Sequence, residues 1–104
     1  MSSAVDWEGR NFQALMLNQA MLGAITPNFR MVVLSRKDDE WVIKFFLEDD
    51  VQDDCDEVED IMCQFSAYQD FDLKYKWEVL IGNEALPKIS QDEMMVFRRK
   101  EYFD

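Results

Sequence analysis

The feature that most constrains the fold of this chain is the run EDDVQDDCDEVED at residues 48–60. Nine of its thirteen residues are carboxylates, and none is lysine or arginine. Carboxylates at this density cannot be buried without partners, so most of the segment must face water. Its apolar residues nevertheless recur at intervals of four and three, which predicts an amphipathic helix with a single buried stripe. That stripe consists of Val51, Cys55, Val58, Met62 and Phe65.

The charge on this helix exceeds what helix formation alone explains. Carboxylates near a helix N-terminus gain about 0.3–1 kcal/mol each from the helix dipole, but the effect fades within one turn. The dipole therefore does not account for Glu57, Glu59 and Asp60. Two interpretations of the charge stay open, a solvated face that keeps the protein soluble and a docking surface for a basic protein. We define the acidic patch as the candidate partner-binding residues Asp49, Asp50, Asp53, Asp54, Asp56, Glu57 and Asp60.

A second helix is predicted near the N-terminus, over residues 12–22. Its apolar side chains fall at helical spacing, with Phe12, Leu15, Met16 and Leu22 on the face expected to be buried. This pattern indicates a helix buried over much of its circumference. Four further apolar residues widen the face, namely Ala14, Leu17, Ala20 and Met21. A glycine follows the helix at position 23, where a C-terminal cap is expected.

Four segments have the composition of strands. Residues 29–35 and 40–48 are rich in β-branched and aromatic residues, and the polar loop 36–39 between them predicts a β-hairpin. Residues 71–81 alternate apolar and polar side chains, which is typical of a half-buried strand. Residues 93–102 are expected to form the last strand.

The element order α-β-β-α-β-β predicts an α+β fold. Two helices on one face of a four-stranded, mainly antiparallel sheet satisfy this order. The chain of 104 residues has the length of one domain, so we expect a single globular domain over residues 1–104, with residues 1–9 as a loosely held N-terminal segment.

Composition excludes several classes of function. With 22 acidic and 11 basic residues the formal charge is −11, so we expect repulsion from nucleic acids and anionic membranes and attraction to basic proteins. The chain has no histidine, so the Ser-His and Cys-His pairs of many enzymes cannot form. No phosphate-binding glycine loop or C-x-x-C pair is present. We therefore expect no enzymatic activity, no metal site and no cofactor.

The two cysteines and the absence of targeting segments bear on location. Cys55 and Cys63 lie eight residues apart on one predicted helix, about 12 Å along its axis, which is too far for a disulfide. Free thiols are typical of a reducing compartment. We see no signal peptide and no apolar run of membrane-spanning length. A cytoplasmic protein is expected.

Several segments, taken in order, resemble those of a known class of proteins. MLGAITPNFRMVVLS (21–35) joins a helix end, a Thr-Pro-Asn turn and a first strand. An acidic amphipathic helix, a loop containing Pro87 and the closing MVFRRKE (95–101) follow. This arrangement resembles small bacterial toxin-immunity proteins, in particular those of contact-dependent growth-inhibition systems, over roughly residues 12–101.

The resemblance implies a cytosolic antitoxin without enzymatic activity. Such a protein binds the C-terminal toxin domain delivered by neighbouring cells, commonly blocking the active site or a nearby exosite. These toxins are often nucleases with basic substrate-binding surfaces. The resemblance does not locate the contact surface, and the choice of the acidic patch rests on charge. We expect the free chain to be a monomer that binds neither nucleic acid nor membrane directly.

Three other interpretations stay open. The chain could be an acidic adaptor or chaperone subunit for another basic protein. It could be a self-associating subunit in which the edge strand FRRKEY pairs with a second copy. It could also be an enzyme that works through carboxylates alone, which would require a deep cleft and an acid of raised pKa.

Overall fold

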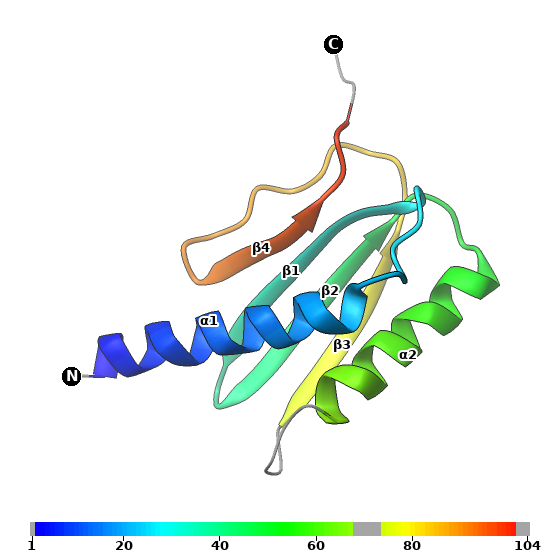
Figure 1. Cartoon of the computed structure of the whole chain (residues 1–104). Helices are drawn as coiled ribbons and strands as arrows, with labels where there is room; N and C mark the ends of the chain where they lie inside the picture. Colours follow the sequence, from blue (N-terminus) through cyan, green and yellow to red (C-terminus); the bar gives the residue numbers. More distant parts are fainter. Residues whose placement is uncertain (1, 68–73, 102–104) are drawn as a thin grey trace.

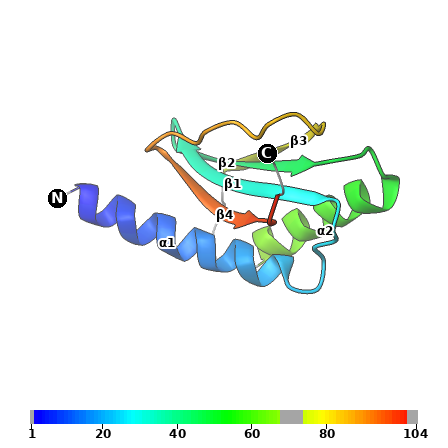
Figure 2. The ribbon, with the colours of Figure 1, turned by 90° about the horizontal axis from the view of Figure 1, so that it is seen from above.

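The computed structural model describes residues 2–67 and 74–101 and confirms the predicted order α-β-β-α-β-β (Figure 1). Both helices lie on one face of a four-stranded sheet (Figures 1 and 2), which confirms the predicted fold class. The first residues of the expected strand 71–81, residues 71–73, and the last residue of the expected strand 93–102 lie outside the described residues. The elements are α1 (Ser2–Met21), β1 (Phe29–Lys37), β2 (Glu40–Leu47), α2 (Gln52–Ala67), β3 (Tyr75–Ile81) and β4 (Glu93–Arg98).

The sheet is mixed, with strand order β3-β2-β1-β4. β1 pairs antiparallel with both β2 and β4, whereas β2 and β3 are parallel. Two consecutive parallel strands cannot be joined by a tight turn, because the chain must return to the starting end of the first strand. α2 provides this return, so the acidic helix is the crossover of a β-α-β unit.

The β1–β2 hairpin turns more tightly than the sequence predicts. Pairing continues to Lys37 and Glu40, and only Asp38 and Asp39 form the turn. Both have positive φ angles, 52° and 66°. Two positive φ angles match the right-handed twist of the flanking strands, and aspartate is among the residues that accept this conformation.

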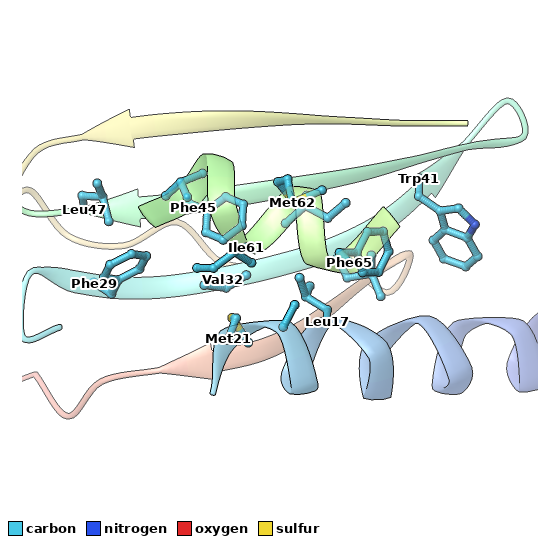
Figure 3. Packing of buried hydrophobic residues seen from close by; sticks show 14 residues of the cluster. Leu17, Met21, Phe29, Val32, Trp41, Phe45, Leu47, Ile61, Met62 and Phe65 are labelled. Carbon is cyan, nitrogen blue, oxygen red and sulfur yellow. The ribbon is translucent and has the colours of Figure 1, made fainter. Parts of the chain in front are cut away.

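The hydrophobic core fills the space between the helices and the sheet (Figure 3). The predicted stripe of α2 is confirmed at Val58, Met62 and Phe65, which are fully buried, while Val51 precedes the helix and is exposed. Each fully buried side chain of this size contributes about 1.5–3 kcal/mol. The sheet contributes Phe29, Val32, Leu34, Trp41, Ile43, Phe45 and Leu47 to this core.

The buried face of α1 is only part of the predicted one. Leu17, Ala20 and Met21 pack into the core, whereas Phe12 and Leu15 are exposed and Leu22 is 78% exposed. The helix has apolar residues around most of its circumference, so spacing alone is compatible with more than one buried face. Contacts with α2 and β4 select the face that is buried. The helix also begins at Ser2, so that residues 2–9 form its first turns.

The face of the sheet opposite the helices is crossed by the connection between the two edge strands. Residues 82–92 run from the end of β3 to the start of β4 over this face (Figure 2). A small hollow of about 150 Å³ separates part of this connection from the sheet, between Leu86 and Phe46.

In residues 2–67 and 74–101, neither helix has the length and apolar character of a membrane span.

An ion-pair network, with the buried Arg30–Glu101 pair at its centre, fastens the segment after β4 to β1. The guanidinium of Arg30 donates two hydrogen bonds to the Glu101 carboxylate, at 2.6 and 3.1 Å, and a third to the Gly82 carbonyl at 2.9 Å. Arg99 also binds Glu101, at 2.6 Å, and reaches Glu48 at 2.5 Å. These hydrogen bonds, that from Arg30 above all, lower the pKa of Glu101 from 4.5 to about 2. Two arginines of an acidic protein are thereby neutralised internally.

The network predicts a specific dependence of stability on pH. Because the folded pKa of Glu101 lies below its ordinary value, its stabilisation is present above about pH 5 and is lost as pH falls towards 2. We expect Glu101→Gln to reduce the free energy of unfolding at pH 7 by about 3 kcal/mol and to flatten its decline between pH 5 and 2. Urea unfolding across this pH range measures both effects.

Glu59→Gln is the matched control, since it makes the same change of charge at an exposed position on α2. It should change the unfolding free energy by less than about 0.5 kcal/mol. Equal profiles for the two variants would mean that the Arg30–Glu101 pair does not contribute to stability.

Candidate protein-binding surface

The acidic patch lies on α2 and on the loop that precedes it. Asp53, Asp56 and Asp60 are exposed on the outer face of α2, and Glu57 is half-buried beside them. The two loop residues of the patch, Asp49 and Asp50, are exposed just before the helix begins. Figure 1 shows α2 running beside β3, so the patch borders the β3 side of the sheet.

Among the described residues, no basic side chain forms an ion pair with a carboxylate of the patch. Asp56 accepts a hydrogen bond only from the neutral amide of Gln52, at 2.9 Å. The α2 segment contains no lysine or arginine. Its negative potential is therefore available to a partner, within the screening length of about 8 Å at physiological salt.

Asp54 differs from the other members of the patch because it is only 7% exposed. The hydroxyl of Thr26 donates a hydrogen bond to one carboxylate oxygen at 3.1 Å. The side-chain amide of Asn28 donates a hydrogen bond to the other oxygen at 3.0 Å. This carboxylate therefore fastens α2 to the turn before β1 and is not available to a partner. Asp54 lies four residues before Val58 and seven before Ile61, which places it on the buried stripe, a signal that the run of surrounding charge obscures.

Asn28 also fixes the loop that carries Asp49. Its side-chain amide donates to the carbonyl of Asp49 at 2.9 Å and its side-chain oxygen accepts from the N–H of Asp49 at 2.8 Å. Its own backbone carbonyl accepts from the N–H of Glu48 at 2.9 Å. The Thr-Pro-Asn turn thus holds both parts of the patch, the loop and the helix, in one arrangement.

The carboxylates and thiols near the patch are the side chains there that could bind a metal ion or act as nucleophiles. Within residues 2–67 and 74–101, no group of three histidine, cysteine or acidic side chains is arranged to hold a metal ion. Cys55 and Cys63 are both free thiols. Burial, together with the neighbouring charge and hydrogen bond of Asp50, raises the pKa of the Cys55 thiol, which favours the unreactive protonated form.

Exposed apolar side chains lie on the same elements as the patch and on β3, and the sequence predicts that most of them are buried. Val51 is exposed between the loop and helix parts of the patch. Trp77 and Ile81 on β3 are 38% and 44% exposed, although their alternation with charged residues predicts a buried face. Their exposure follows from the position of β3 at the edge of the sheet, which periodicity does not encode. Apolar groups of this kind serve as anchors at the centre of protein interfaces.

Comparison with known proteins identifies one family. A family model described as MafI2 immunity protein matches residues 13–101, a span that takes in α2, all four strands and residues 13–21 of α1. This match confirms the predicted resemblance to bacterial toxin-immunity proteins, although the family is not specific to contact-dependent growth inhibition. A comparison with curated proteins gave no match.

The two neighbouring residues Asp53 and Asp54 should respond differently to the same substitution. Asp54→Ala leaves Thr26 and Asn28 without their acceptor, so we expect the free energy of unfolding to fall by about 1–3 kcal/mol. Asp53→Ala removes an exposed charge from a crowded surface and should change it by less than about 0.5 kcal/mol. Urea unfolding at pH 7 distinguishes the two. Equal losses would contradict the structural role of Asp54.

Proposed function

The chain belongs to the MafI2 immunity protein family, and we propose that it neutralises its cognate toxin by covering a basic surface of that toxin with the acidic patch. Membership of the family indicates that the protein neutralises a toxin, and that it does so as an inhibitor rather than as an enzyme. Our proposal adds the chemistry of the partner, a basic, nuclease-type toxin domain, and the mechanism, a combined steric and electrostatic occlusion of its substrate surface.

The observation that carries this proposal is the uncompensated charge of α2. A nuclease must hold phosphates, so its substrate surface presents lysine and arginine side chains. The exposed carboxylates of Asp53, Asp56 and Asp60 would take the place of those phosphates. Arginine binds carboxylates through two parallel hydrogen bonds, which supplies geometric specificity as well as attraction. The formal charge of −11 would also accelerate the encounter with a basic partner.

The hydrogen bonds beneath the patch support the same function. Asp54 and Asn28 fix the loop and the helix before any partner arrives. A surface already held in its binding conformation loses less conformational entropy on association, which favours a tight complex. The buried Asp54 therefore contributes to binding indirectly, by positioning the other six members of the patch.

The alternative of self-association through FRRKEY receives no support from the contacts of that segment. β4 ends at Arg98, and the side chains of Arg99 and Glu101 are held by Glu48 and Arg30. We propose that the free chain is a monomer. We also propose that it acts in the cytoplasm, where the free thiols of Cys55 and Cys63 would remain reduced.

The proposal predicts that charge on α2 matters more than the same charge elsewhere. We expect the triple variant Asp53→Asn, Asp56→Asn, Asp60→Asn to bind the purified toxin domain at least roughly 100-fold more weakly at low salt, because desolvated arginines would lose their partners. Glu57 is left in place because it is half-buried. The toxin domain to use is the one whose gene adjoins that of this chain, and calorimetry gives the dissociation constants.

A matched triple variant changes Asp38, Asp39 and Asp92 to asparagine. It makes the same change in net charge, at exposed positions away from α2. It should retain affinity to within roughly fivefold, because only long-range attraction is reduced. Equal losses in both variants would show that overall charge, and not the patch, determines binding.

A further inference from the structure

β3 is an edge strand without a proline or a bulge, two of the features that protect an edge, although it carries the charged side chains of Lys76 and Glu78. It pairs with β2 on one side, and none of the strands among the described residues pairs with its other side. Its register with β2 is unbroken from Tyr75 to Ile81, and its sequence YKWEVLI contains no proline or glycine. Natural edge strands are commonly kept short, bulged or broken by proline, because an open edge recruits further strands.

The pairing with β2 identifies the backbone groups that are open. Trp41 donates its N–H to the carbonyl of Lys74 at 2.9 Å, and Gly82 donates its N–H to the carbonyl of Leu47 at 3.0 Å. In a parallel pair, alternate residues of a strand direct both of their backbone groups to the same neighbour. The even-numbered residues of β3 thus bond to β2. Tyr75, Trp77, Val79 and Ile81 present their N–H and C=O groups on the open side.

The side chains along this edge are those of an interface. Trp77 and Ile81 are substantially exposed. Trp77 stacks on Tyr75, with ring centroids 6.2 Å apart, and Tyr75 packs edge-on against Phe65 of α2 at 6.0 Å. The exposed indole is therefore backed by the core and already oriented, as expected of an anchor for a partner.

The opposite edge of the sheet is different. β4 has six residues, and its pairing with β1 is interrupted by a bulge between Val32 and Val33. The exposed basic residue Arg98 lies at its end. A bulged edge with adjacent positive charge disfavours the addition of another strand, and of a basic strand in particular.

We propose that β3 is the docking strand of this protein and that an extended, basic segment of the toxin adds to it as a fifth strand. This inference rests on the proposed function and specifies how the toxin is held. Backbone hydrogen bonds to Tyr75, Trp77, Val79 and Ile81 would supply affinity, as in other cases of strand addition. The carboxylates of α2, which runs beside β3 (Figure 1), would supply selectivity for basic side chains of the added segment.

Charge favours a basic partner over a second copy of the chain at this edge. Antiparallel pairing of β3 with its counterpart would extend one continuous sheet and bring both α2 helices to the same face. Each helix carries the uncompensated carboxylates of Asp53, Asp56 and Asp60, and each chain has a formal charge of −11. Like charges at such an interface oppose association. A basic strand meets attraction at the same place.

Hydrogen exchange of backbone amides tests the docking strand directly. In the free chain the outward amides of Tyr75, Trp77, Val79 and Ile81 should exchange rapidly, and the inward amides of Lys76, Glu78 and Leu80 slowly. In the complex with the adjoining-gene toxin domain, we expect exchange of the outward amides to slow by roughly 100-fold. NMR resolves these amides individually.

Proline substitution gives a second readout. Trp77→Pro replaces an outward N–H and places a ring on the open edge, without removing a hydrogen bond to β2. Trp77→Ala removes the same side chain and keeps the N–H. We expect the proline variant to lose at least roughly tenfold more toxin affinity than the alanine variant. Far-UV circular dichroism and thermal unfolding confirm that both variants fold, and the exchange measurement on the unchanged chain does not depend on either variant.

The outcomes separate the two proposals. A complex that forms without protection of the outward amides, or with equal losses for both Trp77 variants, overturns the docking strand and leaves the immunity function standing. Failure of any complex to form overturns the proposed function and this inference with it. Protection that rises with concentration in the free chain, accompanied by dimers in sedimentation, would show that a second copy occupies the edge and contradict the assignment of a toxin strand.

Discussion

The parallel pairing of β3 with β2 is the constraint on which the arrangement of this protein depends. Parallel neighbours require the chain to return across a face of the sheet, and α2 is the element that makes this return. The acidic helix must therefore lie over the β2–β3 side, with Phe65 against Tyr75. The same pairing leaves β3 at the edge, so one topological choice places the open side of β3 close to the carboxylates of α2.

Charge is neutralised by ion pairs in the network around Glu101 but not, among the described residues, along α2. Arg30 and Arg99 are neutralised by Glu101 and Glu48, which fastens the end of the chain to β1. The carboxylates of α2 have no basic partner among the described residues. Repulsion among them costs stability, and the buried stripe and the Asp54 hydrogen bonds offset that cost. An inhibitor that recognises a basic surface requires this separation, because internally paired charges have little attraction left for a partner.

Sequence composition and periodicity predict where the helices and strands lie. They do not predict which faces of the helices are buried or which strands lie at the edges of the sheet. β-branched and aromatic composition indicates β1 and β2, alternation indicates β3, and the 4-3 spacing indicates α2, since each depends on which residues avoid water locally. The buried face of α1 is predicted too broadly, because Phe12 and Leu17 are equally apolar and only packing against α2 and β4 distinguishes them. Strand order is likewise invisible to periodicity, so the exposure of Trp77 could not be predicted. Asp54 is missed because its partners, Thr26 and Asn28, lie more than twenty residues away.

The most direct test of the central claim is a titration of the unmodified chain with its cognate toxin domain at about 50 mM and about 500 mM salt. Electrostatic recognition through the acidic patch predicts tight binding at low salt and a dissociation constant that rises steeply with salt, because the exposed carboxylates become screened. Tight binding that does not depend on salt would contradict the role of the patch, and absence of binding at both concentrations would contradict the immunity function itself.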